Sequence, residues 1–278
     1  MQFDLVIQGQ HIDEPGIEAL ARLCKAAQWR RLGPGAARLT GADRGASMAR
    51  ACADLKLDYA FVPAQARLTD FGLVAIDMDS TLINIECIDE LADMAGIKPQ
   101  VAKLTASTMR GEIDFSESLK RRTALLAGLH ESALERVWNE RLQLSPGAER
   151  LIDGLKVRGI RTLLASGGFT FFTERLKARL GLDYAFSTEP EIVGGRLTGR
   201  IAGRILDAGG KAGAVRRVRE AHALSPEQVI VMGDGANDLA MMAEAGVSIA
   251  YHAKPVVQQQ TTYSFNHVGL DGLLNLYL

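Results

Sequence analysis

The segment Leu73-Val74-Ala75-Ile76-Asp77-Met78-Asp79-Ser80-Thr81 decides the fold prediction. Its four apolar residues predict a buried strand of a parallel sheet, and this strand runs directly into two carboxylates. Charge at such a position must be paired or bound to a ligand, because burying a lone carboxylate is costly. In open α/β sheets, ligands bind at the carboxyl ends of the strands. Asp77 and Asp79 therefore suit a site for a hard cation such as Mg²⁺ together with a phosphate.

A second strand with a polar end is predicted at residues 161–168, Arg-Thr-Leu-Leu-Ala-Ser-Gly-Gly. Ser166 can donate its hydroxyl to a phosphate oxygen. Gly167 and Gly168 allow main-chain N–H groups to approach the same oxygens, and the helix expected from about Phe169 adds its positive end. The segment predicts a phosphate-binding turn, although a simple strand-to-helix connection would explain the same residues.

Two further segments extend the pattern. Lys211 follows two glycines at the start of a helical run over residues 212–222, where its ammonium group can offset phosphate and carboxylate charge. Residues 229–238, Val-Ile-Val-Met-Gly-Asp-Gly-Ala-Asn-Asp, again combine an apolar strand with a polar turn. Asp234 is expected at the end of this strand, where it can ligate the same cation from a neighbouring position. Asn237 and Asp238 fall in the first turn of the next helix.

Each segment alone has a simpler explanation. The first could be a turn that caps the following helix. A lysine at a helix start is usually a solvated surface charge, and Asn237 with Asp238 could serve only in N-capping. Four such segments in this order favour one shared catalytic site over four separate coincidences.

Together, the four segments resemble the motifs of the haloacid dehalogenase superfamily of phosphotransferases, and residues 71–278 are similar to its phosphoserine phosphatase family. The resemblance implies that Asp77 is the nucleophile that becomes a phosphoaspartate, and that Asp79 is the general acid and then the base. It implies a Mg²⁺ site formed by the carboxylates of Asp77 and Asp234 and the main-chain carbonyl of Asp79. It also implies that Ser166 and Lys211 clamp the phosphate and that Asp238 orients Lys211. Asn237 is implied to make a polar contact near the phosphate.

A helical insertion is predicted inside residues 71–278, between Glu86 and about Leu144, with helices over residues 88–95, 98–109, 114–126 and 131–142. An insertion directly after the first motif can cover the site and exclude water. In the third of these helices, Phe115, Leu119 and Arg122 share one face, which an ordinary amphipathic helix would also explain.

The resemblance assigns substrate contacts to this region. Arg122 is implied to form a bidentate pair with the substrate carboxylate, and Glu86 to receive the substrate ammonium group. Phe115 is implied to point into the pocket, and Met109 to form an apolar wall. The implied reaction is Mg²⁺-dependent hydrolysis of O-phosphoserine to serine and phosphate, the last step of serine biosynthesis.

Composition limits the other classes of function. The 278 residues leave room for one large or two modest domains, and the formal net charge of −1 favours neither nucleic acid nor an anionic membrane. No apolar run reaches the ~18 residues of a membrane span, and the N-terminus lacks a signal-peptide pattern. Three cysteines at unrelated spacings indicate a reducing compartment. We therefore expect a cytoplasmic protein that acts on a small molecule, with no nucleic-acid or membrane partner.

Residues 1–70 are predicted to form a separate domain. Strands over 3–7, 29–32, 36–39 and 57–62, with helices over 15–27 and 45–55, give the βαββαβ order of the ferredoxin-like α+β fold. Residues 13–17, Asp-Glu-Pro-Gly-Ile, resemble the loop of amino-acid-binding ACT domains, although the same residues are common at helix starts. We favour a docking or dimerisation module, which would allow a homodimer, over an effector site.

The complete fold prediction is α/β. Residues 71–278 form a Rossmann-like parallel sheet of the haloacid dehalogenase kind with a helical cap at about 87–145, and the ferredoxin-like domain precedes it. A related phosphatase or phosphotransferase acting on phosphohomoserine or another small phosphate monoester stays open, because one methylene changes binding by only ~1–3 kcal/mol. A regulatory amino-acid-binding protein is disfavoured by the intact motifs, and a cation-transport ATPase by the missing membrane helices.

Overall fold

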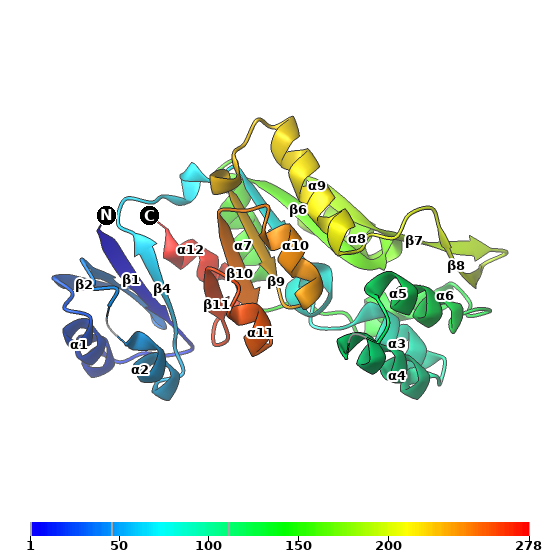
Figure 1. Ribbon diagram of the computed structural model, residues 1–278, viewed down its shortest axis with the longest axis horizontal. Coiled ribbons are helices and arrows are strands. Elements are labelled where there is room, and N and C mark those ends of the chain that lie inside the picture. The colour runs from blue at the N-terminus through cyan, green and yellow to red at the C-terminus, as the bar shows by residue number, and fades with distance from the viewer. Residues whose placement is uncertain (1, 46, 111, 278) are drawn as a thin grey trace.

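The computed structural model describes residues 2–45, 47–110 and 112–277, except for the side chain of Met109 (Figure 1). Its larger sheet has seven strands within these residues, in the order β11-β10-β9-β5-β6-β7-β8. All neighbouring strands are parallel except β7 and β8, which form an antiparallel hairpin. This arrangement confirms the predicted Rossmann-like sheet. The strands are β5 (Leu73–Ile76), β6 (Arg161–Phe169), β7 (Tyr184–Val193), β8 (Arg196–Ala202), β9 (Val229–Gly233), β10 (Val247–Tyr251) and β11 (Tyr263–Phe265).

Helices cover both faces of this sheet, which explains the continuous apolar run of β5. Leu73 and Ala75 pack with α9 and α10, whereas Val74 and Ile76 belong to the larger core with α7, α8 and α12. A central strand buried on both faces needs apolar residues at every position. The helices are α7 (Ala148–Val157), α8 (Thr170–Leu180), α9 (Ala208–Ala221), α10 (Leu239–Met242), α11 (Pro255–Gln258) and α12 (Leu273–Leu276).

The predicted helical cap is confirmed, and it projects from the sheet at the end far from the N-terminus (Figure 1). The two chain segments that connect it to the sheet are hydrogen bonded to each other, with Asn84 N–H to Gln143 O and Ser145 N–H to Leu82 O, both at 3.0 Å. The cap is also tied to β8, where Gly128 N–H donates to Leu197 O at 2.8 Å. The cap helices are α3 (Cys87–Met94), α4 (Lys98–Met109), α5 (Phe115–Ala124) and α6 (Ser132–Glu140).

The N-terminal residues form a four-stranded antiparallel sheet in the order β2-β3-β1-β4, which confirms the ferredoxin-like arrangement. Both of its helices are shorter than predicted. The first ends early because Lys25 adopts a left-handed φ of 51° and Ala26 N–H closes the helix onto Ala21 O. The second begins late because Gly45 N–H donates to the Asp43 carboxylate in a turn. The elements are β1 (Phe3–Gln8), α1 (Glu14–Leu23), β2 (Gln28–Gly33), β3 (Ala36–Thr40), α2 (Met48–Asp54) and β4 (Asp58–Pro63).

The two central strands of this small sheet, β1 and β3, are buried on both faces, because one face carries α1 and α2 and the other packs on the rest of the chain. Val6 and Val62 share a hydrophobic core with Phe71 and Tyr277. Within this contact Arg38 is buried, pairs with Asp4 at 3.2 Å and donates to Leu276 O at 2.8 Å. The N-terminal domain is therefore docked through apolar packing and through buried hydrogen bonds of the Arg38 guanidinium, whose Nε alone has no partner among the described residues.

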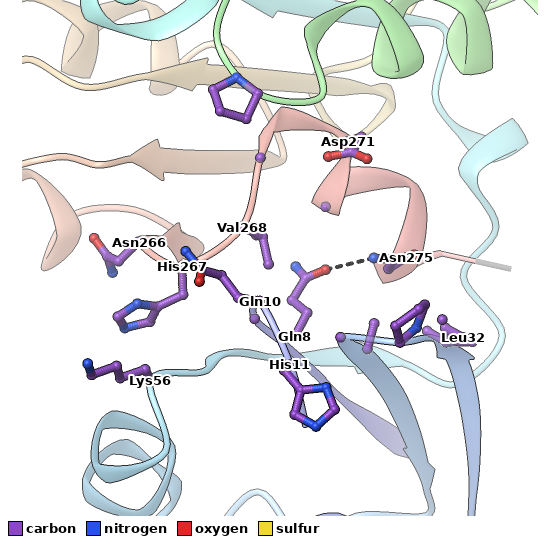
Figure 2. Close-up of a pocket in the computed structure, with 18 of the residues that line it drawn as sticks. Gln8, Gln10, His11, Leu32, Lys56, Asn266, His267, Val268, Asp271 and Asn275 are labelled. Atoms are coloured by element: carbon purple, nitrogen blue, oxygen red, sulfur yellow. Dashed lines mark hydrogen bonds between the residues drawn. The ribbon is translucent and has the colours of Figure 1, made fainter. Parts of the chain in front are cut away.

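Asp58, the first residue of β4, is a second anchor between the domains. Its buried carboxylate accepts the main-chain N–H groups of Asn266 and His267, both at 2.8 Å. A side-chain hydrogen bond of 3.0 Å from Asn275 to Gln8 lies nearby (Figure 2). No helix in the described part of the chain is long and apolar enough to cross a membrane.

Asp58→Ala should lower the free energy of unfolding by about 2–4 kcal/mol, because it leaves two buried N–H groups without an acceptor. Burial raises the pKa of Asp58, so Asp58→Asn, which keeps one neutral acceptor oxygen, should cost less. Urea unfolding of both variants measures this, with Asp54→Ala at an exposed position as the control. Unfolding free energies equal to that of the control would show that Asp58 does not anchor the domains.

Candidate active site

The sheet order brings the polar ends of three strands together. β5 lies between β6 and β9, and Ile76 is in register with both Leu164 and Met232. Asp77, Ser166 and Asp234 therefore leave the sheet from adjacent strands at the same edge. The fourth motif residue, Lys211, lies in the first turn of α9, which begins earlier than expected because Asp207 caps it through Gly210 N–H at 2.8 Å.

The centre of the site is a buried lysine held between two carboxylates. Lys211 Nζ donates to Asp77 Oδ1 and to Asp238 Oδ1, the latter at 2.7 Å, and all three side chains are buried. Asp238 is itself fixed by Gly235 N–H, which donates to its other oxygen at 3.0 Å, while the Asn237 amide lies 3.4 Å from Asp238 Oδ1. This geometry fits the predicted role of Asp238 in orienting the lysine.

The electrostatics of this group follow from its burial. Burial raises the pKa of Asp77 and the charge of Asp238 raises it further, while Lys211 acts in the opposite direction. Burial also disfavours the charge of Lys211, but the two carboxylates outweigh it and raise the pKa of the ammonium group. The lysine therefore stays charged beside a carboxylate whose charge needs additional compensation.

Asp79 lies next to this group in a different hydrogen-bonding environment. Its Oδ1 accepts Cys87 N–H at 2.9 Å, and its Oδ2 accepts the Ser166 hydroxyl at 3.2 Å. Burial raises the pKa of Asp79, although the bond from Cys87 opposes the rise. Gly168 gives Asp79 room, because a methyl group at this position would lie 2.9 Å from Asp79 Oδ2 and would force that side chain to move. A carboxyl with a raised pKa beside a second carboxylate suits proton transfer.

A cation site fits the donor set. Carboxylate oxygens of Asp77, Asp234 and Asp238 lie within 4.8 Å of one another, and burial followed by the charge of Asp238 raises the pKa of Asp234 to about 6. With Asp79 included, four carboxylates face one lysine, and oxygen ligands of this kind bind hard divalent cations. Because both Asp238 oxygens already accept hydrogen bonds, Asp77 and Asp234 are the carboxylates left for a cation.

Ser80 is a residue whose role the sequence did not reveal. It lies in the tight turn Met78–Leu82 with a left-handed φ of 57°, and its hydroxyl donates to Glu86 Oε1 at 2.7 Å. Glu86 is exposed as a residue, but its carboxyl group lies beside the other carboxylates of the site. There, partial loss of hydration and then the charge of Asp79 raise its pKa to about 8. Thr81 was also missed, and its hydroxyl donates to Asp234 at 3.1 Å. The hydroxyl residues that directly follow Asp79 were the only available signal.

The cap contributes an aromatic side chain to the site. The Phe115 ring lies so close to the last residues of β6 that a methyl group on Gly167 would be 2.5 Å from its Cζ. One residue further on, the Ser116 hydroxyl lies 3.3 Å from Asp207 of the sheet domain. Helix α5 therefore rests directly on the predicted phosphate-binding turn.

Arg122 follows on the same helix, two turns after Phe115. It is half-buried, its Nε has no hydrogen-bond partner, and it makes no ion pair among the described residues. Asp89, which the sequence analysis did not single out, also has an unpartnered buried oxygen, and the nearby charge of Arg122 partly offsets the effect of burial, which raises the Asp89 pKa. The predicted wall residue Met109 ends α4, and its side chain lies outside the described part of the structure.

Comparison with known proteins agrees with this geometry. Residues 71–246 match the haloacid dehalogenase-like hydrolase family, and residues 5–46 match a domain of unknown function, DUF4072. A phosphoserine phosphatase of Polaromonas sp. is 51% identical over 215 residues, which cover 76% of this chain and 91% of the relative.

Solved structures extend the similarity to the whole chain. A probable phosphoserine phosphatase from Vibrio cholerae, in unliganded form, has a TM-score of 0.87 at 35% identity and covers 99% of this chain and 86% of its own. A phospho-aspartyl intermediate analogue of phosphoserine phosphatase has a TM-score of 0.70 at 35% identity, covering 75% of this chain and 99% of its own. The chain therefore belongs to the haloacid dehalogenase-like hydrolases and, within them, to the phosphoserine phosphatase family.

Proposed function

We propose that this protein hydrolyses O-phosphoserine to serine and phosphate, with Mg²⁺ as its cation. The observation that carries the proposal is the buried Lys211 between Asp77 and Asp238, beside the Asp79–Ser166 pair. This arrangement supplies a carboxylate nucleophile, a fixed positive charge and a carboxyl group suited to proton transfer within one pocket.

The chemistry divides into two displacements at phosphorus. An Asp77 oxygen attacks, the bond from phosphorus to the serine oxygen breaks, and Asp79 gives its proton to that oxygen. Asp79 then takes a proton from water, the water oxygen attacks the phosphoaspartate, and the bond to Asp77 breaks to release phosphate. Lys211 and Ser166 hold the phosphate oxygens throughout. When bound by Asp77, Asp234 and the Asp79 carbonyl, Mg²⁺ would supply further positive charge at these oxygens.

Substrate selection is assigned to residues above the phosphate site. Arg122 has a buried N–H without a partner, so a substrate carboxylate can satisfy it. Glu86 is held through one oxygen by Ser80, which leaves its second oxygen for an ammonium group. Phe115 fills the space between α5 and Gly167. Phosphohomoserine carries the same two charged groups, so comparing it with phosphoserine decides between these substrates.

The N-terminal domain, residues 1–70, is assigned a docking role. Arg38 and Asp58 are both committed to contacts with the C-terminal residues, and no assigned catalytic group lies before residue 71. The domain boundary and the docking role rest on these contacts. A homodimer through this domain remains a prediction from the sequence.

Asp77→Asn should lower kcat for phosphoserine by at least about 10³-fold, because an amide oxygen cannot form the acyl phosphate. The fold should persist, and no phosphoenzyme should be trapped with radiolabelled substrate. Asp153→Asn, an exposed carboxylate on α7, is the matched control and should keep full activity. Normal turnover by Asp77→Asn would refute the proposed nucleophile.

Excess EDTA should abolish activity, and added Mg²⁺ should restore it. Ca²⁺ should restore little, because its larger and more flexible shell allows bidentate carboxylates that would occupy the attacking oxygen. Phosphate release measures the effect, and EDTA saturated with Mg²⁺ beforehand is the control. Full activity in free chelator would contradict a cation-dependent mechanism.

Arg122→Ala should reduce kcat/KM for phosphoserine by an amount equivalent to about 2–5 kcal/mol, the typical loss of a desolvated charge pair. An aryl phosphate, which has no carboxylate, should lose little. Arg121→Ala is the matched control, because this neighbouring arginine is exposed and pairs with Glu117 at 2.6 Å. An equal loss for both substrates would assign Arg122 to cap structure or phosphate binding instead.

A further inference from the structure

A cavity of about 730 Å³ lies at the junction of the N-terminal domain and the C-terminal segment (Figure 2). We call it the seam pocket. Its N-terminal wall includes residues 9–11, 32–36 and 55–56, and its opposite wall includes residues 266–269 and 271–272. None of the candidate active-site residues lines it. Its volume lies within the range of small-molecule sites.

The seam pocket is bordered by one lysine and three histidines, of which His267 lies near enough to the Asp58 carboxylate to interact with its charge. Lys56, His11, His252 and His267 all border it, and none of the four side chains makes an ion pair in the described part of the chain. Figure 2 shows Lys56 on the N-terminal domain and His267 on the C-terminal segment.

The pocket has a single acidic lining residue. Asp271 is already paired with Arg150, another lining residue, at 3.1 Å. The chain as a whole has a formal net charge of −1, so this local excess of basic groups does not follow from overall composition. An ammonium group without an ion-pair partner, beside imidazole N–H donors on a concave surface, attracts anions.

We propose that the seam pocket binds a small anion with two or more negative charges, carried by phosphate or carboxylate groups. An ammonium group and imidazole N–H groups from three segments can donate charge-assisted hydrogen bonds to such oxyanions. The amide side chains of Gln10 and Asn266, which also line the pocket, can bind remaining oxygens. The ligand would bridge the two domains, because Lys56 and His267 belong to opposite walls.

The pocket is connected to the cap through one short segment. Pro146 lines it, and Pro146 O accepts at 2.8 Å the N–H of Leu270, which lies between the lining residues Gly269 and Asp271. The preceding residue, Ser145, is hydrogen bonded to Leu82 in the pair of segments through which the chain enters and leaves the cap. An anion in the pocket therefore lies one residue from the cap connection. This part of the inference rests on the proposed function, since it predicts that the anion changes substrate use.

Binding is tested by titration calorimetry on the full chain with Mg²⁺, using two probes. Tricarballylate represents polycarboxylates and sulfate represents phosphate groups, while glycerol is the uncharged control. The double variant Lys56→Gln/His267→Gln should bind the preferred probe at least tenfold more weakly than the natural chain. Lys103→Gln, at an exposed lysine on the cap helix α4, should bind it normally. Equal midpoint temperatures of thermal unfolding for the three proteins without probe establish that the substitutions leave folding unchanged.

Two results would contradict the proposed binding site. One is that neither probe binds above the glycerol control. The other is that the double variant binds as tightly as the natural chain, which would place the anion in the active site or at unspecific surface charge. A preference for one probe identifies the group, carboxylate or phosphate, that the pocket recognises.

Coupling to the cap is tested separately by kinetics. At saturating probe, the KM for phosphoserine should change at least twofold in the natural chain and in Lys103→Gln, but not in the double variant. Bound probe with unchanged kinetics would overturn the coupling. If the chain did not hydrolyse phosphoserine at all, the proposed function would fail while the calorimetric result would still decide the binding site.

Discussion

The site depends on one electrostatic constraint, the burial of Lys211 between Asp77 and Asp238. An ammonium group removed from water is stable only beside compensating carboxylates, and carboxylates so close together need the ammonium group in return. The sheet order satisfies both needs, since β5 and β9 are adjacent and α9 approaches their ends from one face. The same excess of negative charge that the lysine leaves unbalanced is what a divalent cation can neutralise.

The sequence was sufficient to predict the features that depend on where the strands end. Apolar runs that stop at Asp77, Ser166 and Asp234 predicted both the parallel sheet and the edge where these residues meet, because parallel strands place their carboxyl ends together. Contacts formed only by the tertiary fold were not predictable. The hydrogen bond from Ser80 to Glu86 depends on a left-handed backbone that serine does not signal, and Asp89 becomes notable only when it lies near Arg122.

In the N-terminal domain, too, local features could be predicted from the sequence and tertiary contacts could not. Its βαββαβ order follows from local patterns, whereas its docking depends on partners more than 200 residues away in sequence. Arg38 reaches Leu276, and Asp58 reaches Asn266 and His267. Nothing in the neighbourhood of either residue indicates burial of its charge. A charged residue within a short strand is typical of a solvent-exposed face. Its burial can be recognised only when the surface that packs against the strand is known.

The paired segments at the base of the cap have a consequence for how this fold can diversify. The chain leaves the sheet domain after Leu82 and returns at Ser145, and main-chain hydrogen bonds hold these two points side by side. The insertion therefore begins and ends at two adjacent points of the sheet domain, which are held at a fixed separation. An insertion of different length or helix content can be exchanged at this junction while the sheet keeps its register and its carboxylates. If the cap residues select the substrate as proposed, specificity and chemistry are carried by separable parts of one chain, and each can change during evolution while the other is preserved.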